Sequence, residues 1–360
     1  MFSNKDLRNM IVPLFMEQFL VMLVGIIDTF VVSYVGEAAV SGVSLVNTIF
    51  IYLFTALASG GAVVISQYLG SKDQNNTVKS SSQLLMFSTL FSIVLGILVL
   101  IFSQSLLSFL FGKVETSVMD ACMTYLKISA YSYPALAIYN AGAAMYRSMT
   151  KTSTTMYLSI VSNIINVIGN MIGVFVLHAG VAGVAYPSLI ARAFSAIVIT
   201  ILLFNKKYEA HYVKEWLFKF DFSLLKKMLN IAIPNGIENG IFQLVKVALS
   251  SVVAMFGTYQ IAANGVAQSI WSLAALVGSA MGPVFITVVG QCMGASDIDQ
   301  ADYYFKKLMK ITLVLSIAWN AFILAITPVF MNFYVLSDKT KAPLKRLSGV
   351  FFEPSIRLIL

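Results

Sequence analysis

The stretch from Pro13 to Gly36 is almost wholly apolar, yet it holds two carboxylates, Glu17 and Asp28. It is long enough to cross a bilayer as one helix, which needs about 20 apolar residues. At about 100° per residue, the eleven-residue spacing returns both acids to one helix face, roughly 16 Å apart along the axis. An acid near a bilayer centre costs on the order of 2.5 to 3.5 kcal/mol, so it usually faces a protein interior or a wet cavity and marks an ion or proton path. We expect this role for Asp28, whereas solvation at a helix end explains Glu17 equally well.

Similar apolar runs recur along the whole chain of 360 residues, of which 58% are hydrophobic and 11% are charged. A soluble domain is typically about 45 to 50% apolar and 25% charged. The runs predict nine membrane-spanning helices, near residues 11–35, 44–69, 84–110, 121–145, 154–177, 182–204, 229–256, 264–290 and 307–335. We therefore predict an all-α integral membrane protein that crosses a lipid bilayer several times.

Basic residues are distributed very unevenly between the predicted connections. The N-terminus and the connections after the even-numbered spans hold fifteen Lys and Arg residues, against one, Lys113, in the connections after the odd-numbered spans. Cytoplasmic loops of membrane proteins are enriched in Lys and Arg. The N-terminus is therefore expected on the cytoplasmic side of a cell membrane, and the net charge of +8 gives no reason to expect a nucleic-acid partner.

The chain also contains an internal repeat. At an offset of 221 residues, a proline, a glutamate and a glycine recur, which pairs Pro13, Glu17 and Gly36 with Pro234, Glu238 and Gly257. After a slip of three residues the repeat continues at the end of the second span of each copy, where Gln67, Gly70 and Asp73 match Gln291, Gly294 and Asp297. Six spans separate the copies, so both run in the same direction and are related by a pseudo-two-fold axis along the membrane normal. Asp28 is matched by Leu249, so the aspartate belongs to the first copy.

The repeat predicts two helical bundles of unequal length. Residues 1–205 would form a six-helix N-terminal bundle, residues 206–228 a cytoplasmic linker, and residues 229–336 an incomplete second bundle of three helices. Residues 337–360 share nothing with their expected counterpart in the first copy and are too charged for a span. We therefore expect a chain truncated after its ninth span, with transport impaired in this form, and a monomer when complete.

A seam of polar residues runs along the fifth predicted span. Its members, Ser159, Asn163, Asn166 and Asn170, are spaced four, three and four residues apart and fall within an arc of about 60°. The seam must face protein, where it would either join helices by hydrogen bonds or supply oxygen ligands. In the second case Asp28 with Asn163, Asn166 and Asn170 forms a site for a hard cation such as Na⁺, or a relay for a proton.

Other polar and aromatic residues within the spans are candidates for the wall of a substrate cavity. They are Glu17, Tyr139, Asn140, Glu238, Gln243 and Lys246. Lys246 in the seventh span and Arg192 in the sixth both need partners, for which an ion pair or a side chain reaching the interface is the simpler explanation. The 17 Met, 26 Phe and 16 Tyr residues would suit a pliable aromatic cavity for varied apolar cations, although core packing explains most of them equally well.

The sequence lacks the motifs of ATP-driven or enzymatic function. It contains no G-x-x-x-x-G-K-[ST] motif, no nucleophile elbow and no His-rich metal motif. Cys122 and Cys292 match no metal or redox spacing and are interpreted as packing residues. We therefore expect no enzymatic activity, no cofactor, and no bound metal beyond Na⁺ at Asp28.

Several segments resemble the multidrug and toxic compound extrusion (MATE) transporters. PLFMEQ and DTFVVSYVGEAAVSGVSLVN resemble the family's first span and outer loop, NAGAAMYRSM the end of its fourth span, NIINVIGN its fifth, and IPNGIENGIFQL and FGTYQIAANGVAQSI its seventh and eighth. The resemblance covers roughly residues 8–336. It implies two six-helix bundles and a secondary antiporter, which exchanges Na⁺ or H⁺ inward for amphipathic, often cationic drugs or metabolites outward. It also implies a first-bundle cation site at Asp28, Asn166 and Asn170, places Glu238 one turn before the acid of some branches, and points to a bacterial cytoplasmic membrane.

Two other functions remain open. A lipid-linked saccharide flippase of the same superfamily would share the bundles but would line its cavity with more Arg and Lys, to bind pyrophosphate. A non-transporting membrane subunit would use Asp28 and the asparagine seam to join helices. An ion-coupled exporter is the reading we prefer, because the cavity-facing sequence has few basic residues.

Overall fold

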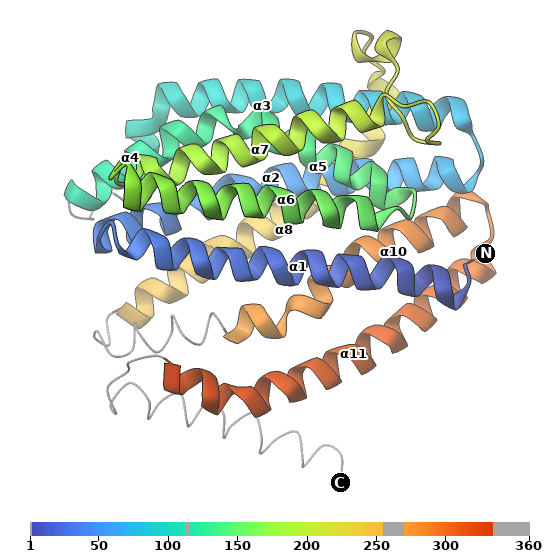
Figure 1. The fold of residues 1–360 in the computed structure, drawn as a ribbon. Coiled ribbons are helices and arrows are strands. Elements are labelled where there is room, and N and C mark those ends of the chain that lie inside the picture. Colours follow the sequence, from blue (N-terminus) through green and yellow to red (C-terminus); the bar gives the residue numbers. More distant parts are fainter. Residues whose placement is uncertain (1, 112–115, 255–269, 334–360) are drawn as a thin grey trace. The chain divides into compact units, whose positions relative to one another are not determined.

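The computed structural model describes residues 2–111, 116–254 and 270–333, and within them the long elements are all α-helices (Figure 1). The helices are α1 Asn4–Ser33, α2 Glu37–Gly70, α3 Gln74–Phe111, α4 Thr116–Tyr131, α5 Tyr133–Ser148, α6 Thr152–Met171, α7 Ala182–Leu203, α8 Phe222–Ala254, α10 Leu276–Gly294 and α11 Ile298–Phe333. A π-helical turn, Ile172–Val176, extends α6, and a short 3₁₀ turn, Lys214–Leu217, lies between α7 and α8. The predicted all-α fold class is confirmed.

The fourth predicted span, 121–145, is two helices rather than one. α4 ends at Tyr131 and α5 begins at Tyr133. Pro134 lies in the first turn of α5, where its missing N–H costs no hydrogen bond, whereas in a continuous helix it would break one. The Ser132 hydroxyl donates to the Ser129 carbonyl at 2.7 Å and so satisfies one of the carbonyls at the break.

Within the described residues, seven helical segments are long and apolar enough to cross a membrane. α4 and α5, with 16 residues each, are individually too short. α8 is not among the seven, and its apolar sequence is interrupted by Asn235, Glu238, Asn239 and Lys246. Of the nine predicted spans, those at 121–145 and 229–256 are therefore not among the segments that qualify by length and composition in the described residues. The prediction of several membrane-spanning helices is confirmed.

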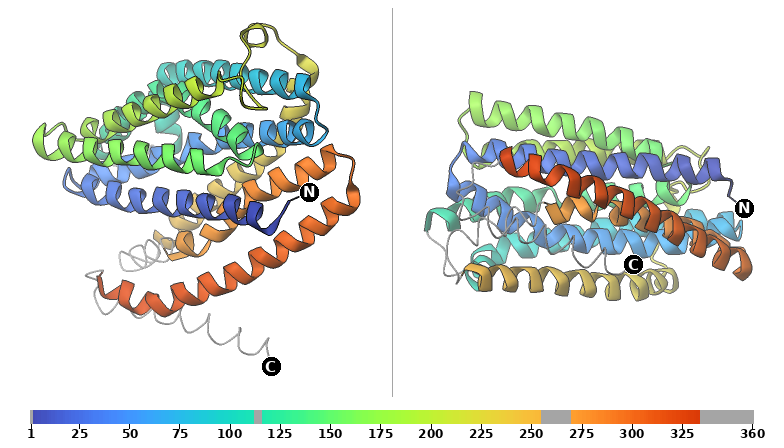
Figure 2. Two further views of the ribbon diagram at one scale, coloured as in Figure 1. Left: turned by 45° about the vertical axis from the view of Figure 1, so that its right-hand side comes forward. Right: turned by 90° about the horizontal axis from the view of Figure 1, so that it is seen from below.

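The chain divides into two compact units. The first comprises Met1–Gly240 with Ala280–Phe305, and the second Ile241–Ser279 with Lys306–Leu360. In the first unit, α1 to α7 lie side by side with their long axes nearly aligned (Figure 1 and Figure 2). α1 packs on α6, α6 on α7, and α2 on both α4 and α5. The bundle boundaries expected from the repeat stay a prediction, and the tail 337–360 lies outside the described residues.

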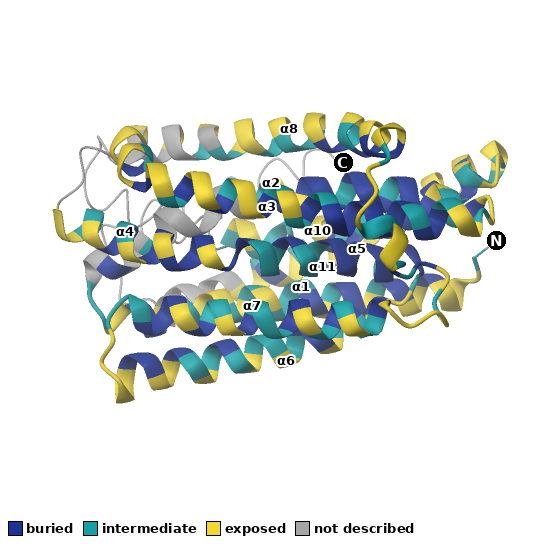
Figure 3. Ribbon diagram, turned by 90° about the horizontal axis from the view of Figure 1, so that it is seen from above, coloured by how far each residue is buried: buried dark blue, intermediate teal, exposed yellow. Residues whose placement is uncertain are grey.

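α6 carries its polar residues on the buried side. Ser159, Asn166 and Asn170 are buried, whereas Ile164 and Ile168 are each 53% exposed. Exposed and buried residues alternate along the neighbouring α7 in the same way (Figure 3). A soluble amphipathic helix has the opposite arrangement. The inward polar seam suits a helix that has lipid on one side and a polar protein interior on the other.

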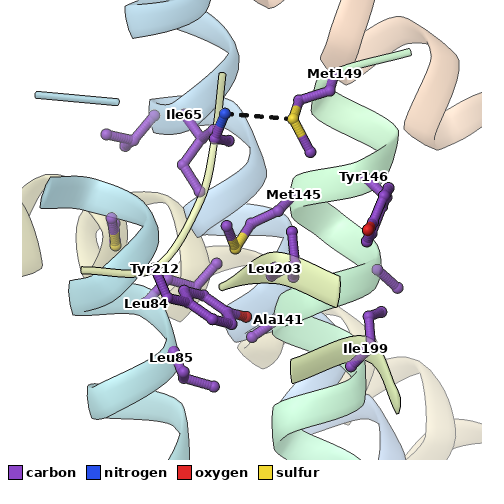
Figure 4. Packing of buried hydrophobic residues seen from close by; sticks show 14 of the residues in the cluster. Ile65, Leu84, Leu85, Ala141, Met145, Tyr146, Met149, Ile199, Leu203 and Tyr212 are labelled. Atoms are coloured by element: carbon purple, nitrogen blue, oxygen red, sulfur yellow. Dashed lines mark hydrogen bonds between the residues drawn. The ribbon is translucent and has the colours of Figure 1, made fainter. Parts of the chain in front are cut away.

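The largest group of buried apolar side chains joins α2, α3, α5 and α7 (Figure 4). Its completely buried members include Ile65, Leu84, Ala141, Met145, Tyr146, Ile199 and Leu203. The segment that follows α7 enters the same core, where the Ala210 N–H donates to Met149 Sδ at 3.3 Å. This core fixes the helices that surround the polar cavity described below.

The turns after α2 and α10 share one geometry. Lys72 and Ser296 are equivalent in the repeat, and their φ angles are both positive, at 56° and 58°. The next residues, Asp73 and Asp297, each accept at Oδ1 the backbone N–H of the third residue beyond, at 3.0 Å in both cases. These carboxylates cap the first turns of α3 and α11. The matching YLGSKD and CMGASD segments are therefore one capped turn, used twice.

The second helices of the two repeats cross at a pair of glycines. A Cβ atom on Gly70 would overlap the backbone of Gln291, and one on Gly294 would overlap the backbone of Gln67. Because Gln67 and Gly70 are the repeat equivalents of Gln291 and Gly294, the contact is reciprocal, as a contact across a two-fold axis must be. The crossing supports the pseudo-two-fold relation expected from the sequence.

The segment between α7 and α8 is held against α3 by one buried glutamine. Gln83 Nε2 donates to the carbonyls of Trp216, at 2.8 Å, and of Lys219. Gln83 Oε1 accepts the Asp221 N–H at 3.0 Å. Lys79, one turn earlier on α3, pairs with the Asp221 carboxylate and lowers its pKa. The connecting segment is therefore fixed to the bundle through its backbone.

We expect Gly294→Ala to lower the melting temperature of the purified protein, because the added methyl group would force α10 away from Gln67. Gly282→Ala is the matched control on the same helix, since no atom lies within 4 Å of its Cβ position. Gly to Ala inside a helix normally stabilises by about 0.5 to 1 kcal/mol, so the control should stay level or rise. Equal melting temperatures for the two variants would contradict the close crossing.

We expect Gln83→Leu to expose the connecting segment to trypsin at Lys214 and Lys219. The substitution leaves two carbonyls and one N–H without their partner, at about 1 to 3 kcal/mol for each buried group, so cleavage should accelerate about tenfold or more. Gln74→Leu is the control, because Gln74 donates to the Glu209 carbonyl of the same segment in an exposed bond. Similar cleavage rates for both variants would contradict the anchoring role of Gln83.

Candidate functional site

A cavity of about 530 Å³ lies inside the first unit, with α1, α5, α6 and α7 forming most of its wall. Glu17 and Asp28 both line it from α1, so their eleven-residue spacing does bring both acids to one cavity. Asn163 and Asn166 line it from α6. The inward polar seam of α6 therefore faces this cavity.

Asp28 is bound by the asparagines of α6. Asn170 Nδ2 donates to Asp28 Oδ1 at 2.7 Å and lies 3.2 Å from Asn166 Oδ1. Asn170 is completely buried and Asn166 is 8% exposed. Asn166 and Asn170 project from one face of α6, one turn apart. Both amides therefore lie beside the Asp28 carboxylate of α1. Three of the predicted site residues, Asp28, Asn166 and Asn170, therefore form one cluster.

The amide of Asn166 fits its surroundings better with its nitrogen toward Asp28. In that orientation Nδ2 lies 3.0 and 3.1 Å from the two oxygens of Asp28, and Oδ1 accepts the Ser188 hydroxyl at 2.9 Å. In the reversed orientation Nδ2 donates to Ser188 Oγ at 2.9 Å and Oδ1 accepts from Asn170, but Oδ1 then faces the two carboxylate oxygens of Asp28, which are also acceptors. Ser188, on α7, supports both orientations because a hydroxyl can donate and accept.

The cluster contains one acceptor that is not satisfied. Asn170 Oδ1 is buried and has no hydrogen-bond partner among the described residues. A buried acceptor without a partner costs about 1 to 3 kcal/mol. When a proton or a small cation is bound at the carboxylate, an amide can face it with its oxygen in place of its N–H. Carboxylate, amide and hydroxyl oxygens are ligands for hard cations rather than for soft transition metals.

Glu17 is buried at the other end of the cavity lining on α1. Its Oε1 accepts Arg147 Nη2, from α5, at 2.7 Å, and its Oε2 accepts the Thr155 hydroxyl, from α6, at 3.0 Å. The side chain of Glu17 is 3% exposed and that of Arg147 is 22% exposed. Glu17 is therefore paired inside the bundle, and the alternative of solvation at a helix end is wrong.

Arg192 and Asn163 also line the cavity, apart from the Asp28 cluster. Arg192 Nη1 donates to Ser132 Oγ at 2.7 Å, and it forms no ion pair within the described part of the chain. Asn163 Nδ2 lies 3.5 Å from Ser159 Oγ on its own helix. No hydrogen bond joins Asn163 to Asp28 in the described residues. Of the three asparagines predicted for the cation site, the structure brings two to the aspartate.

Tyr139 and Asn140, predicted as cavity residues, line the cavity from α5. Asn140 Nδ2 is buried and has no hydrogen-bond partner among the residues that the structure describes. Asn140 also borders a second cavity of about 50 Å³, whose wall comes from α2, α5 and α10. Its amide nitrogen is thus a buried donor without a partner among the described residues, beside both cavities.

The three candidates on α8 do not line the large cavity. Glu238 is exposed and Gln243 is half-buried. In the second unit, Lys246 Nζ lies 4.0 Å from the ring centre of Trp271 and 5.0 Å from that of Phe242. The partners of Lys246 in the described residues are therefore aromatic rings, which attract a cation through their π faces. Of the two explanations expected for Lys246, the ion pair is not seen among the described residues.

Three polar partners, Arg147, Thr155 and Ser188, were not predicted from the sequence. The predicted fourth span ends at residue 145 and leaves Arg147 in a cytoplasmic connection, whereas α5 continues to Ser148 and Arg147 pairs with Glu17 inside the bundle. Thr155 lies four residues before Ser159, so extending the polar seam by one turn would have found it. Ser188 is one of four hydroxyl residues of α7, with Tyr186, Ser195 and Thr200, and no sequence pattern distinguishes it from the others.

Comparison with known proteins agrees with this fold. The profile of the MatE family matches residues 13–172 and again 234–352. The two matches begin at Pro13 and Pro234, the first pair of the internal repeat, and the second match continues past residue 336, where the resemblance was expected to end. The chain therefore carries two copies of the family's repeat unit.

Two relatives from Bacillus subtilis (strain 168) align with most of the chain. The "Uncharacterized transporter YisQ" is 27% identical over 329 residues, which cover 89% of this chain and 70% of the relative. The "Probable multidrug resistance protein YoeA" is 26% identical over 279 residues, which cover 74% of this chain and 59% of the relative. The chain thus spans roughly three fifths to seven tenths of the length of these relatives.

Solved structures share the architecture. A MOP superfamily transporter from Pyrococcus furiosus matches with a TM-score of 0.83 at 18% identity, over 94% of this chain and 75% of that one. An outward-facing multidrug resistance MATE family transporter matches with a TM-score of 0.82 at 18% identity, over 91% of this chain and 73% of that one. With the family profile matching well over half of its residues, the chain belongs to the MatE family of transporters.

Proposed function

We propose that this protein is a secondary active exporter, which moves amphipathic, often cationic compounds out of the cell in exchange for Na⁺ or H⁺. Residues Asp28, Asn166 and Asn170 would bind the coupling ion, and Ser188 would orient the Asn166 amide. The N-terminus would lie in the cytoplasm of a bacterial cell, as the distribution of Lys and Arg indicates.

The observation that carries the proposal is the Asp28 cluster inside a cavity of a membrane-spanning bundle. A carboxylate that only joined helices would need its hydrogen-bond donors and no space beside it. Here the carboxylate borders a cavity of about 530 Å³, and a neighbouring amide oxygen is left without a partner. Ionisable residues placed in this way in membrane proteins mark ion or proton pathways.

One coupling ion at Asp28 is enough to drive export. An elementary charge that crosses the membrane potential supplies about 2.3 kcal/mol per 100 mV. With 1.36 kcal/mol for each factor of ten, this free energy sustains a concentration ratio of about 50-fold for a neutral compound exchanged one for one, since one net charge then crosses the membrane. Exchange for a singly charged cation moves no net charge and is driven by the concentration gradient of the coupling ion instead. No ATP-binding motif is therefore required.

The relatives support the class of transported compound. YoeA is described as a probable multidrug resistance protein, and an aligned solved structure as a multidrug resistance transporter. The flippase alternative would require several free basic groups for pyrophosphate. In the described cavity Arg147 is already paired with Glu17, which leaves Arg192.

We expect Asp28→Asn to abolish gradient-driven efflux of a fluorescent cation such as ethidium from proteoliposomes, while ethidium binding in the absence of a gradient persists. The amide keeps the size of the side chain but can neither take up a proton nor pair with Na⁺. Glu238→Asn serves as the control, since it removes an exposed acid outside the cavity. Undiminished efflux from the Asp28 variant would exclude this residue as the coupling site.

We expect the double variant Asn166→Ala with Asn170→Ala to raise the Na⁺ concentration needed for half-maximal efflux by about tenfold or more, since two amide oxygens able to turn toward the ion are lost at about 1.5 to 3 kcal/mol each. If H⁺ is the coupling ion, the shift should have the opposite sign, because the amide N–H groups that favour the ionised Asp28 carboxylate are lost. Asn163→Ala, on the same helix without a bond to Asp28, should shift this concentration much less. A collapse of protein yield in the double variant, with normal coupling in the protein that remains, would show instead that these asparagines join helices.

A further inference from the structure

The cavity that holds Asp28 ends at one level on three different helices. On α1 its lining runs from Glu17 to Val32, on α5 it ends at Arg147, and on α6 it begins at Ser159. Arg147 is the last residue but one of α5, so this end of the cavity lies toward the turn that joins α5 to α6. The Glu17–Arg147 ion pair therefore occupies the end of the cavity nearer the N-terminus.

Beyond this ion pair, where α5 ends, buried residues of α1 lie beside the start of α6. Leu7, Met10 and Leu14, which precede Glu17 on α1, are at most 2% exposed. Thr152, at the start of α6, is 1% exposed, and its hydroxyl lies 3.2 Å from the carbonyls of Asn9 and Met10. A hydrated ion that left Asp28 in this direction would meet first the ion pair and then a dry layer.

The ion pair is satisfied by its neighbours except at one atom. Both carboxylate oxygens of Glu17 accept hydrogen bonds, from Arg147 and from Thr155. Arg147 Nε is buried and has no hydrogen-bond partner in the described part of the chain. A buried ion pair is costly to desolvate and often no more stable than an apolar replacement, so its presence is weak evidence for a purely stabilising role.

α10 is bound to the turn of α5 that carries the arginine. Thr287 Oγ1 donates to the Arg147 carbonyl at 3.0 Å, and Gln291 Nε2 donates to the Ser148 carbonyl at 2.7 Å. Gln291 belongs to the glycine crossing between α2 and α10. Arg147 also borders the smaller cavity between α2, α5 and α10. A movement of α10 would therefore pull directly on the helical turn that holds Arg147 against Glu17.

We infer that the Glu17–Arg147 ion pair is the barrier that closes the Asp28 cavity toward the N-terminal side of the bundle, and that α10 holds this barrier shut. The inference rests on the proposed function, because a barrier matters to transport only if an ion crosses there. In this arrangement Glu17 and Arg147 control the path by which the ion leaves, and Asp28 binds the ion. Thr155 stabilises the closed position of Glu17.

The barrier can be tested by labelling, without any transport assay. In the full chain with Cys122→Ala and Cys292→Ala, Ser159→Cys places one thiol on the cavity wall, one turn of α6 beyond Thr155. A membrane-impermeant, positively charged methanethiosulfonate reagent is applied from either face, in inside-out and right-side-out vesicles. Labelling from the face of the N-terminus should be slow in this background.

Glu17→Gln and Arg147→Gln should each accelerate labelling from that face by about tenfold or more, because an uncompensated buried charge draws water into the layer. Arg192→Gln is the matched control: it removes a charge from the same cavity away from its closed end, and its rate should stay at the background value. If neither Glu17→Gln nor Arg147→Gln accumulates in the membrane, Thr155→Val takes their place. It removes one hydrogen bond and keeps the ion pair, and it should accelerate labelling about threefold.

Unchanged rates in the variants that accumulate, with the thiol fully reactive after denaturation, would overturn the inference. Equal acceleration by Arg192→Gln would also overturn it, since the effect would then belong to any lost charge. Because labelling needs neither a gradient nor a transported compound, absent efflux would count against the proposed function and leave the barrier result standing.

Discussion

A carboxylate inside a membrane-spanning bundle must be compensated from within the protein, and the arrangement of the first unit follows from that requirement. The two acids of α1 are met in different ways. Asp28 is contacted by neutral amides beside a cavity. Glu17 is paired with a guanidinium and accepts a hydrogen bond from a hydroxyl. The same helix thus carries one site suited to binding an ion and one suited to closing a path.

The compensating groups come from α5, α6 and α7, so the packing of these helices sets the chemistry of the cavity. α6 can carry five buried polar residues inward because its opposite face is apolar and exposed, as a lipid-facing surface requires. Pro134 separates α4 from α5, and α5 then continues to Ser148. Without these last residues of α5, Arg147 would lie in a loop and Glu17 would have no cationic partner in the bundle.

The repeat accounts for the scaffold and the differences between its copies account for the site. The capped turns at Asp73 and Asp297 and the reciprocal crossing at Gly70 and Gly294 are the same in both copies, because helix capping and close backbone approach depend on single residue types. Asp28 has no acidic counterpart, since Leu249 stands in its place.

The sequence alone determined the all-α membrane fold, the repeat and the polar seam of α6. Hydropathy and helical periodicity carry that information, because a buried polar group in lipid must face protein. The set of Asp28, Asn166 and Asn170 came from the family resemblance, since periodicity by itself does not separate these two asparagines from Asn163. Tertiary structure alone decided that Asn163 stays away from Asp28, that Lys246 lies against Trp271 and Phe242, and that Glu17 pairs with Arg147. These contacts join residues up to 130 positions apart, and no local pattern encodes which side chain meets which across a bundle.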